Sequence, residues 1–154
     1  MTLNTILIDN YIINKVKILQ SKKPFPLACG EVLSSIDIAY CTYGQLNPQK
    51  NNVVWICHAL TANADAMDWW DGLVGAGKIF DPAKYFIICA NTLGSCYGAT
   101  CPSSINPATG TAYHKDFPLI TVQDIVNSHD LLRQHLGIKQ INILVGGSMV
   151  VNKF

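Results

Sequence analysis

The sequence has little charge: only 14% of its 154 residues are charged, and the net charge is +1. Such a balance gives no electrostatic footprint for nucleic acid or for an anionic membrane. No apolar run reaches the roughly 18 residues that a membrane span needs, and residues 1–10 lack the basic-then-apolar pattern of a signal peptide. What is present is 49% hydrophobic residues, which is typical of a globular chain. We therefore expect a globular protein with no nucleic-acid or membrane partner.

The setting of the six cysteines argues against three disulfides. Cys57 and Cys89 lie in apolar runs, where a free cysteine acts as a small hydrophobe. Chains of this size that are not small secreted scaffolds do not usually depend on disulfides. Cys96 and Cys101 lie close in sequence, but a zinc site needs about four ligands, and no second pair with histidine at ligand spacing follows. We expect reduced thiols, a cytoplasmic location, and neither a metal nor a resident cofactor.

The apolar pattern predicts an α/β fold. Residues 36–43 alternate in part and are typical of a strand. Continuous apolar runs follow at 53–57, 85–90 and 141–145. Runs of this kind favour parallel strands that are buried on both faces.

One convincing helix lies between the last two runs. Thr121 can cap its start, with Asp124 three residues later, and apolar residues recur at helical spacing over 122–136. Gly137 suits the position just past the helix end. Strand, helix and strand together predict a right-handed crossover within the sheet.

Residues 91–118 are rich in glycine and proline and show no periodicity. A structureless segment of this length is usually functional or disordered. The segment can be a surface insertion or a packed loop that lines a site, and its Tyr, Cys and Ser content favours the second interpretation.

A candidate nucleophile follows the last apolar run, in the sequence GGSM at 146–149. A serine on a tight turn after a buried strand is the setting of the nucleophile elbow of α/β-hydrolases. The turn strains the backbone of Ser148, so small residues are needed around it. Gly146 fits the G-x-S-x-G pattern, whereas Val150 does not. Taken alone, Gly-Gly-Ser is also a common turn.

The sequence CHALT at 57–61 follows the first of the three runs. In α/β-hydrolases the loop after that strand supplies one oxyanion-hole amide, and the residue after the nucleophile supplies the other. Here the donors would be the backbone amides of Leu60 and Met149, which would stabilise charge on an attacked acyl carbonyl. The triad histidine of this fold follows the serine in chain order, so we interpret His58 as shaping the loop. We expect His114 in a loop, and His129 and His135 at the helix surface or boundary.

Several longer segments, together with these motifs, resemble the homoserine O-acetyltransferase family over residues 25–149. The long Trp-Trp and Ser-Ser-Ile-Asn-Pro segments among them separate that family from generic esterases of the same fold. The segments are DWWDGLVG at 68–75, NTLG at 91–94, CYG at 96–98, PSSINP at 102–107 and DFP at 116–118.

The resemblance implies an α/β-hydrolase fold and a ping-pong acyl transfer. Ser148 would take an acetyl group from acetyl-CoA, and the hydroxyl of L-homoserine would then attack, forming O-acetylhomoserine for methionine synthesis. A histidine would act as base and an aspartate would orient it. The resemblance also implies a homodimer for the full-length enzyme. Trp69 and Trp70 would either wall the site or pack in the core.

The resemblance ends at Met149, because the family continues with two glycines where this chain reads VVNKF at 150–154. The triad Asp and His lie far downstream of the serine in the family and have no counterpart here. We therefore expect a single N-terminal portion, 1–154, of a domain cut just after the elbow, inactive alone and with an aggregation-prone edge at 141–145. Loss of one base from family-like codons would explain both tail and stop, and the DNA past the codon for Phe154 tests this.

Two other functions stay open. The first is a related acyltransferase or esterase of the same fold with another donor or acceptor, such as succinyl-CoA or serine. The second is a non-catalytic fragment that complements a partner chain.

Overall fold

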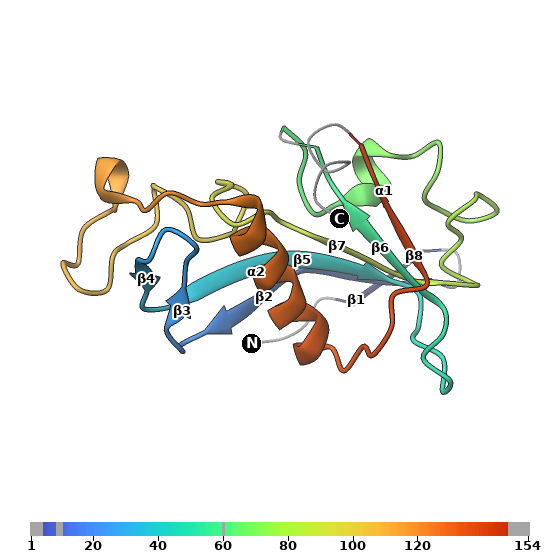
Figure 1. Cartoon of the computed structure of the whole chain (residues 1–154). Coiled ribbons are helices and arrows are strands. Elements are labelled where there is room, and N and C mark those ends of the chain that lie inside the picture. Colours follow the sequence, from blue (N-terminus) through green and yellow to red (C-terminus); the bar gives the residue numbers. More distant parts are fainter. Residues whose placement is uncertain (1–4, 9–10, 60, 148–154) are drawn as a thin grey trace.

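A computed structural model describes residues 5–8, 11–59 and 61–147 of the chain (Figure 1). Its elements in chain order are β1 (Thr5–Ile8), β2 (Tyr11–Ser21), β3 (Phe25–Pro26), β4 (Val32–Leu33), β5 (Ile36–Tyr43), β6 (Val53–Cys57), α1 (Ala66–Trp69), β7 (Phe86–Ala90), a 3-10 turn at His114–Asp116, α2 (Val122–His135) and β8 (Ile143–Gly146).

Most strands form one mixed sheet in the order β1-β2-β5-β7-β6-β8, and β3 and β4 form a separate small pair. β6 runs parallel to both β7 and β8. The β5, β2 and β1 side of the sheet is antiparallel. β7 and β8 lie on the two sides of β6 in the sheet, and α2 lies between them in the chain. The predicted strand–helix–strand crossover is therefore present.

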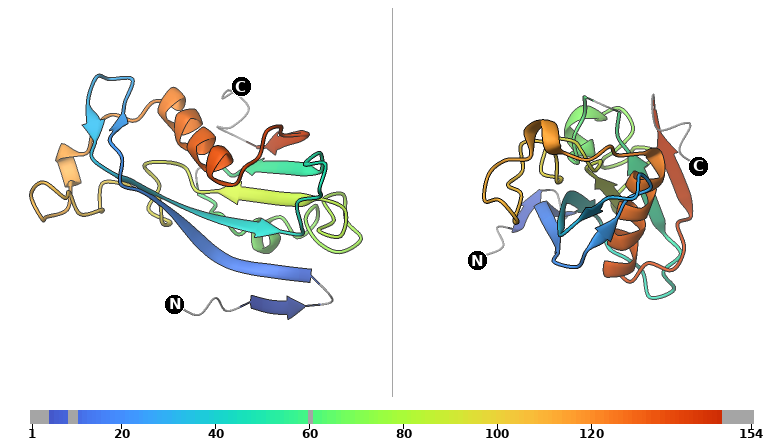
Figure 2. Two further views of the ribbon diagram at one scale, coloured as in Figure 1. Left: turned by 90° about the horizontal axis from the view of Figure 1, so that it is seen from below. Right: turned by 60° about the vertical axis from the view of Figure 1, so that its left-hand side comes forward.

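Side chains of β6 alternate between two cores, as the period of two in a strand requires. Val53, Trp55 and Cys57 join a cluster with Ile125 and Leu132 of α2. Val54 and Ile56 join a second cluster with the segment around α1. The sheet is therefore covered on opposite faces, by α2 on one and by α1 with its neighbouring loops on the other (Figure 2).

The start of α2 is fixed by a capping box. The amide of Asp124 donates to the Thr121 hydroxyl, and the Asp124 carboxylate accepts from the Thr121 amide at 2.8 Å. The other carboxylate oxygen accepts from the amide of Ala28, also at 2.8 Å. These bonds satisfy helix donors that would otherwise lack partners, and they tie α2 to the segment between β3 and β4.

The sequence predictions are largely confirmed. Residues 36–43 and 53–57 are strands with the predicted bounds, the Thr121 cap is present, and Gly137 has φ +65° just past α2. The antiparallel pair β1 and β2 was not predicted.

One prediction about the strands is wrong: β8 is not buried on both faces. Its residues are half-buried or exposed, and Leu144 is 41% exposed. The physical reason is that β8 lies at the edge of the sheet: in the described part of the chain it pairs with β6 alone. Separately, no helix among the described residues is long and apolar enough to span a bilayer.

Candidate active site

The carboxyl ends of β6 and β8 meet at one edge of the sheet. Cys57 pairs with Gly146 in the parallel ladder, so the segments that follow these residues leave the sheet side by side. The predicted oxyanion donors Leu60 and Met149 and the predicted nucleophile Ser148 belong to those two segments. All three lie outside the described residues. The structure therefore shows the edge of the sheet from which their segments start, and it does not describe the positions of the three residues themselves.

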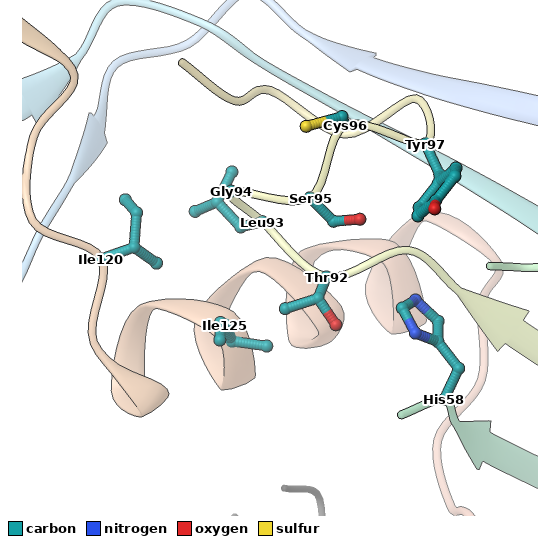
Figure 3. A pocket seen from close by; sticks show the side chains of 9 residues that line it. All are labelled: His58, Thr92, Leu93, Gly94, Ser95, Cys96, Tyr97, Ile120 and Ile125. Atoms are coloured by element: carbon teal, nitrogen blue, oxygen red, sulfur yellow. The ribbon is translucent and has the colours of Figure 1, made fainter. Parts of the chain in front are cut away.

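A cavity of 320 Å³ opens at this edge. Its described lining includes no Asp, Glu, Lys or Arg, and leucine and isoleucine side chains form much of it. The lining residues come from the segment after β6, the loop after β7, the residue before the α2 cap and the first turn of α2 (Figure 3): His58, Thr92, Leu93, Gly94, Ser95, Cys96, Tyr97, Ile120 and Ile125. The cavity is therefore suited to an uncharged group.

His58 directly follows β6 and is only 2% exposed. Its Nδ1 lies 2.8 Å from the carbonyl oxygen of Ala59, to which an Nδ1–H would donate. This contact within the loop supports the predicted loop-shaping role. Figure 3 shows the ring also facing the hydroxyl of Thr92, which leaves β7 beside it. Sequence reasoning did not select Thr92, although its place just after a buried parallel strand was a usable signal.

The wall of the cavity at residues 92–98 is anchored on β5. The amide of Asn91 donates to Ala39 at 2.8 Å, and the amide of Ala39 donates to Gly98 at 3.0 Å. The Asn91 side-chain amide also donates to the carbonyl of Tyr97. Gly98 has φ +104°, and a Cβ there would lie 2.7 Å from that of Ala39. Glycine is thus required where the loop crosses the strand.

The two interpretations of residues 91–118 apply to different parts of the segment. Residues 92–97 line the cavity, and the residues from 99 to 101 are buried. Residues 102–112 are exposed or half-buried. The first part is therefore a site-lining loop, and the second part is a surface insertion.

The prediction for His129 is wrong, because the side chain is 8% exposed and not at the helix surface. Its ring lies 5.9 Å from that of Trp55 between centroids, and its Nε2 is 3.4 Å from the carbonyl oxygen of Asn91. The helical periodicity had already put this position on the apolar face of α2, toward the sheet. His135 is exposed at the end of α2, as predicted. His114 was expected in a loop; it is exposed and begins the 3-10 turn between β7 and α2.

Trp69 and Trp70 stack on each other with ring centroids 5.2 Å apart. Both pack against the core cluster on the α1 face of the sheet, and neither is among the residues that line the cavity. The Trp69 ring nitrogen donates to the carbonyl of Asn63 at 2.9 Å. Of the two interpretations of this pair, the structure supports core packing.

All six cysteines are free thiols, in two kinds of environment. Burial raises the pKa of Cys41 to about 11, and burial also raises the pKa of Cys89 well above its ordinary value. For Cys101, burial acts to raise the pKa, but hydrogen bonds with Ser103, Ser104 and Cys96 outweigh it and lower the pKa. Among the described residues, no three or more His, Cys, Asp or Glu side chains are grouped so as to hold a metal ion.

Comparison with known proteins connects this arrangement to one family and to a narrower group of relatives. Residues 52–149 match the family model of the alpha/beta hydrolase fold. A homoserine O-acetyltransferase of Chlorobium chlorochromatii is 53% identical over 129 residues, which is 84% of this chain. One of Chlorobaculum parvum is 52% identical over 130 residues, also 84% of this chain. The chain spans 36% of the length of each of these two relatives.

Solved structures agree with the sequence comparisons. The crystal structure of esterase E22 has a TM-score of 0.79 and 30% identity, covering 88% of this chain and 41% of that protein. The homoserine O-acetyltransferase from Bacillus anthracis has a TM-score of 0.76 and 34% identity, covering 86% of this chain and 40% of that protein. The predicted α/β-hydrolase fold and the resemblance to homoserine O-acetyltransferases are both confirmed.

Proposed function

Because the chain belongs to the alpha/beta hydrolase fold family, we propose that it is the nucleophile-bearing part of a homoserine O-acetyltransferase. In this role it supplies the serine and the oxyanion donors of an acyl transfer from acetyl-CoA to L-homoserine. The observation that carries the proposal is the pairing of Cys57 with Gly146, which starts the two functional segments side by side. About 50% identity to proteins of that name narrows the proposal from fold to reaction.

In the proposed mechanism Ser148 attacks the thioester carbonyl of acetyl-CoA and becomes acetylated while coenzyme A leaves. The amides of Leu60 and Met149 donate to the oxygen that becomes negative in each tetrahedral intermediate. The hydroxyl of L-homoserine then attacks the acetyl-serine, and O-acetylhomoserine leaves. Neither step needs a metal or a resident cofactor.

The cavity beside these segments supports acyl transfer chemistry. Leu93, Ile120 and Ile125 give it apolar walls, and its described lining carries no ionised acid or base side chain of Asp, Glu, Lys or Arg. Such a wall disfavours ordered water next to an acyl-enzyme, and water is the competitor of the acceptor hydroxyl. An uncharged acetyl group fits this environment better than a succinyl group, which adds a carboxylate.

The 154 residues alone are proposed to have negligible activity. The Asp and His that the family resemblance places downstream of the nucleophile have no counterpart here, and a serine without a base is a weak nucleophile. A C-terminal portion of a relative is proposed to restore the activity. A cytoplasmic location and a homodimer of the restored enzyme belong to the same proposal.

The experiment uses a chimera in which this chain replaces the matched segment of the Chlorobium chlorochromatii relative. We expect O-acetylhomoserine from acetyl-CoA and L-homoserine, detected by mass spectrometry, and none from the 154-residue chain alone. Ser148→Ala in the chimera is expected to abolish the product, whereas Ser34→Ala, at an exposed position between β4 and β5, is expected to preserve it.

The same chimera distinguishes the alternatives. Succinyl-CoA as donor and L-serine as acceptor test the neighbouring acyltransferase reactions. Release of free acetate without transfer would favour an esterase, which the similarity to esterase E22 makes the second candidate. A folded chimera that is inactive in all these assays would overturn the catalytic proposal, and steady product from the 154-residue chain alone would overturn the claim that it lacks activity.

A further inference from the structure

A second cavity, of 400 Å³, lies between the start of β5 and residues 100–113, and the proposed reaction does not use it. Its described lining shares no residue with that of the cavity at the sheet edge. We call it the Asp37 cavity, because Asp37 is the one residue of its described lining with a charged side chain. Aliphatic hydroxyl groups make up most of the remaining polar lining: Ser35, Thr100, Ser103 and Ser104.

The backbone of Asp37 is held in place while its carboxylate is left without a cation. Its amide donates to the Thr100 hydroxyl at 2.7 Å, and its carbonyl accepts from the amide of Thr100 at 2.9 Å. The one ion pair among the described residues joins Asp130 to Arg133, so Asp37 has no cationic partner there. The side chain is half-buried, and a carboxylate attracts a cation more strongly where water is partly excluded.

Hydrogen bonds to Cys101 fix two of the hydroxyl groups. The Ser104 hydroxyl accepts from the amide of Cys101 at 3.0 Å and donates to its sulfur at 3.7 Å. The Oγ of Ser103 lies 3.0 Å from the same sulfur. Because the Ser104 proton is directed to sulfur, its oxygen keeps a lone pair for a further donor. One carboxylate and several hydroxyl oxygens together match an ammonium group, which has three donors and no acceptor.

The rest of the lining is apolar. Ile105 and Pro107 come from the surface insertion, and Tyr113 comes from the end of the segment. Tyr113 is only 8% exposed, and its ring packs edge-on against that of Phe117 with centroids 5.4 Å apart. These side chains give a short aliphatic chain a surface to cover, so the cavity suits a small molecule with one cationic end and one apolar end.

The groove between the end of β2 and the end of α2 has the opposite chemistry. Its volume is 490 Å³, and Lys22, Lys23 and His135 lie in its described lining, which includes no Asp or Glu. A cationic ligand is repelled there and attracted to Asp37. The charge of the lining therefore distinguishes the Asp37 cavity from a groove of similar size.

We propose that the Asp37 cavity is a binding site for a small aliphatic molecule that carries a primary ammonium group. The ammonium group donates to the Asp37 carboxylate and to the hydroxyl oxygens of Ser103 and Ser104, and the aliphatic chain lies against Ile105 and Pro107. Hydrogen bonds between an ammonium group and a carboxylate are about twice as strong as neutral ones. A simple amine and an amino acid share this chemistry, and the experiment below distinguishes them.

Thr100 links this site to the cavity at the sheet edge. Its amide and hydroxyl bond to Asp37, and its carbonyl accepts from the amide of Gly94, in the wall of the other cavity, at 2.8 Å. A ligand that joins Asp37 to Ser103 and Ser104 therefore holds the loop after β7 against β5.

The test titrates butylamine into the 154-residue chain and follows binding by saturation-transfer NMR, in phosphate buffer because Tris is itself a primary amine. We expect butylamine to bind at least about tenfold more tightly than 1-butanol, in which a hydroxyl replaces the ammonium group. Equal binding of the two would overturn the proposal. L-Norvaline adds a carboxylate to the carbon that bears the amine: tighter binding than butylamine supports an amino-acid site, and weaker binding supports a site for simple amines.

Variants place the binding at this cavity. Asp37→Asn keeps the backbone bonds to Thr100 and is expected to weaken butylamine binding at least about tenfold. Asp71→Asn removes the same charge at an exposed position after α1 and is expected to change nothing. Butylamine that binds Asp37→Asn as tightly as wild type would contradict the assignment.

Should Asp37→Asn fail to fold, Ser103→Ala at an exposed position serves instead. It is expected to weaken butylamine binding about threefold, and an unchanged affinity would count against the site. These measurements need neither acetyl-CoA nor L-homoserine, so their outcome is independent of the proposed acyl transfer.

Discussion

The neighbouring parallel strands β6 and β8 have similar apolar sequences and very different surroundings. All five residues of β6 are buried, and Trp55 at its centre is 2% exposed. No residue of β8 is fully buried, and Leu144, which pairs with Trp55 in the ladder, is 41% exposed. In the described part of the chain β6 has a strand on each side and a core on each face, whereas β8 has one neighbour. Apolar sequence sets what a strand can bury, and the elements around it decide what is buried.

The difference is visible where α2 meets β8. A cavity of 170 Å³ lies between them, with Trp55, His129 and Leu144 in its lining. On the other flank α2 packs against β6 and β7 through Leu132 and Ile125. The same helix thus covers one flank of the sheet tightly and leaves space beside the other.

The largest expected effect comes from truncating the two paired side chains. Trp55→Ala removes a fully buried side chain and is expected to lower the free energy of unfolding by about 3–5 kcal/mol. Leu144→Ala removes a side chain from the open flank and is expected to cost under about 1 kcal/mol. Urea unfolding followed by circular dichroism measures both, since fluorescence would change with the loss of a tryptophan. Equal losses in the two variants would contradict the contrast between the strands.

The next effect concerns the helix that covers β6. Asp124→Ala removes the hydrogen bonds to Thr121 and Ala28 and is expected to cost about 1–3 kcal/mol. Burial acts to raise the pKa of Asp124, but the bonds from Thr121 and Ala28 outweigh it and hold the pKa below the ordinary 3.8. Stabilisation from a lowered pKa is complete above that ordinary value and is lost as the pH falls through the folded-state value. The gap between wild type and variant should therefore narrow at acid pH in urea unfolding.

Asp130 provides a matched control on the same helix. It accepts from the Arg133 side chain at 2.7 Å, but the two side chains of this pair are 27% and 45% exposed. Exposed pairs contribute little, so Asp130→Ala is expected to cost under about 1 kcal/mol. If Asp130→Ala lowered the free energy of unfolding as much as Asp124→Ala does, removal of any acidic residue from α2 would explain the effect, and the capping box would not be its cause.

The sequence predicts the features that depend on short-range pattern, and it misses the features that depend on which elements pack over a strand. The runs at 36–43 and 53–57 and the cap at Thr121 have the predicted bounds because apolar period and local hydrogen bonds determine them. The burial of His129 follows from the same helical period, once α2 is known to lie on the sheet. The exposure of β8 has no local signal, because it depends on which elements lie beside the strand.

Prediction of the site divides in the same way. The motifs at 57–61 and 146–149 identify the meeting edge, since parallel strands end together and the pairing of Cys57 with Gly146 confirms it. Thr92 and Ile120 enter the cavity from segments that only the folded chain brings close. A hydrogen bond from the amide of Gly94 to the carbonyl of Thr100 closes the loop that carries the cavity wall, and spacing alone does not reveal it.

The smallest expected change in stability is also the sharpest test of the open flank. Leu144→Lys places a charge on β8 at a 41% exposed position, and is expected to change the free energy of unfolding by about 0.5 kcal/mol or less. Its effect on association should be larger, because an apolar strand with unpaired backbone groups is a template for aggregation and a lysine on such an edge blocks it. Light scattering against concentration should show less aggregate than wild type. Leu119→Lys, at 71% exposure in the segment before α2, adds the same charge outside any strand. An equal reduction by both variants would assign the effect to net charge and not to the open flank.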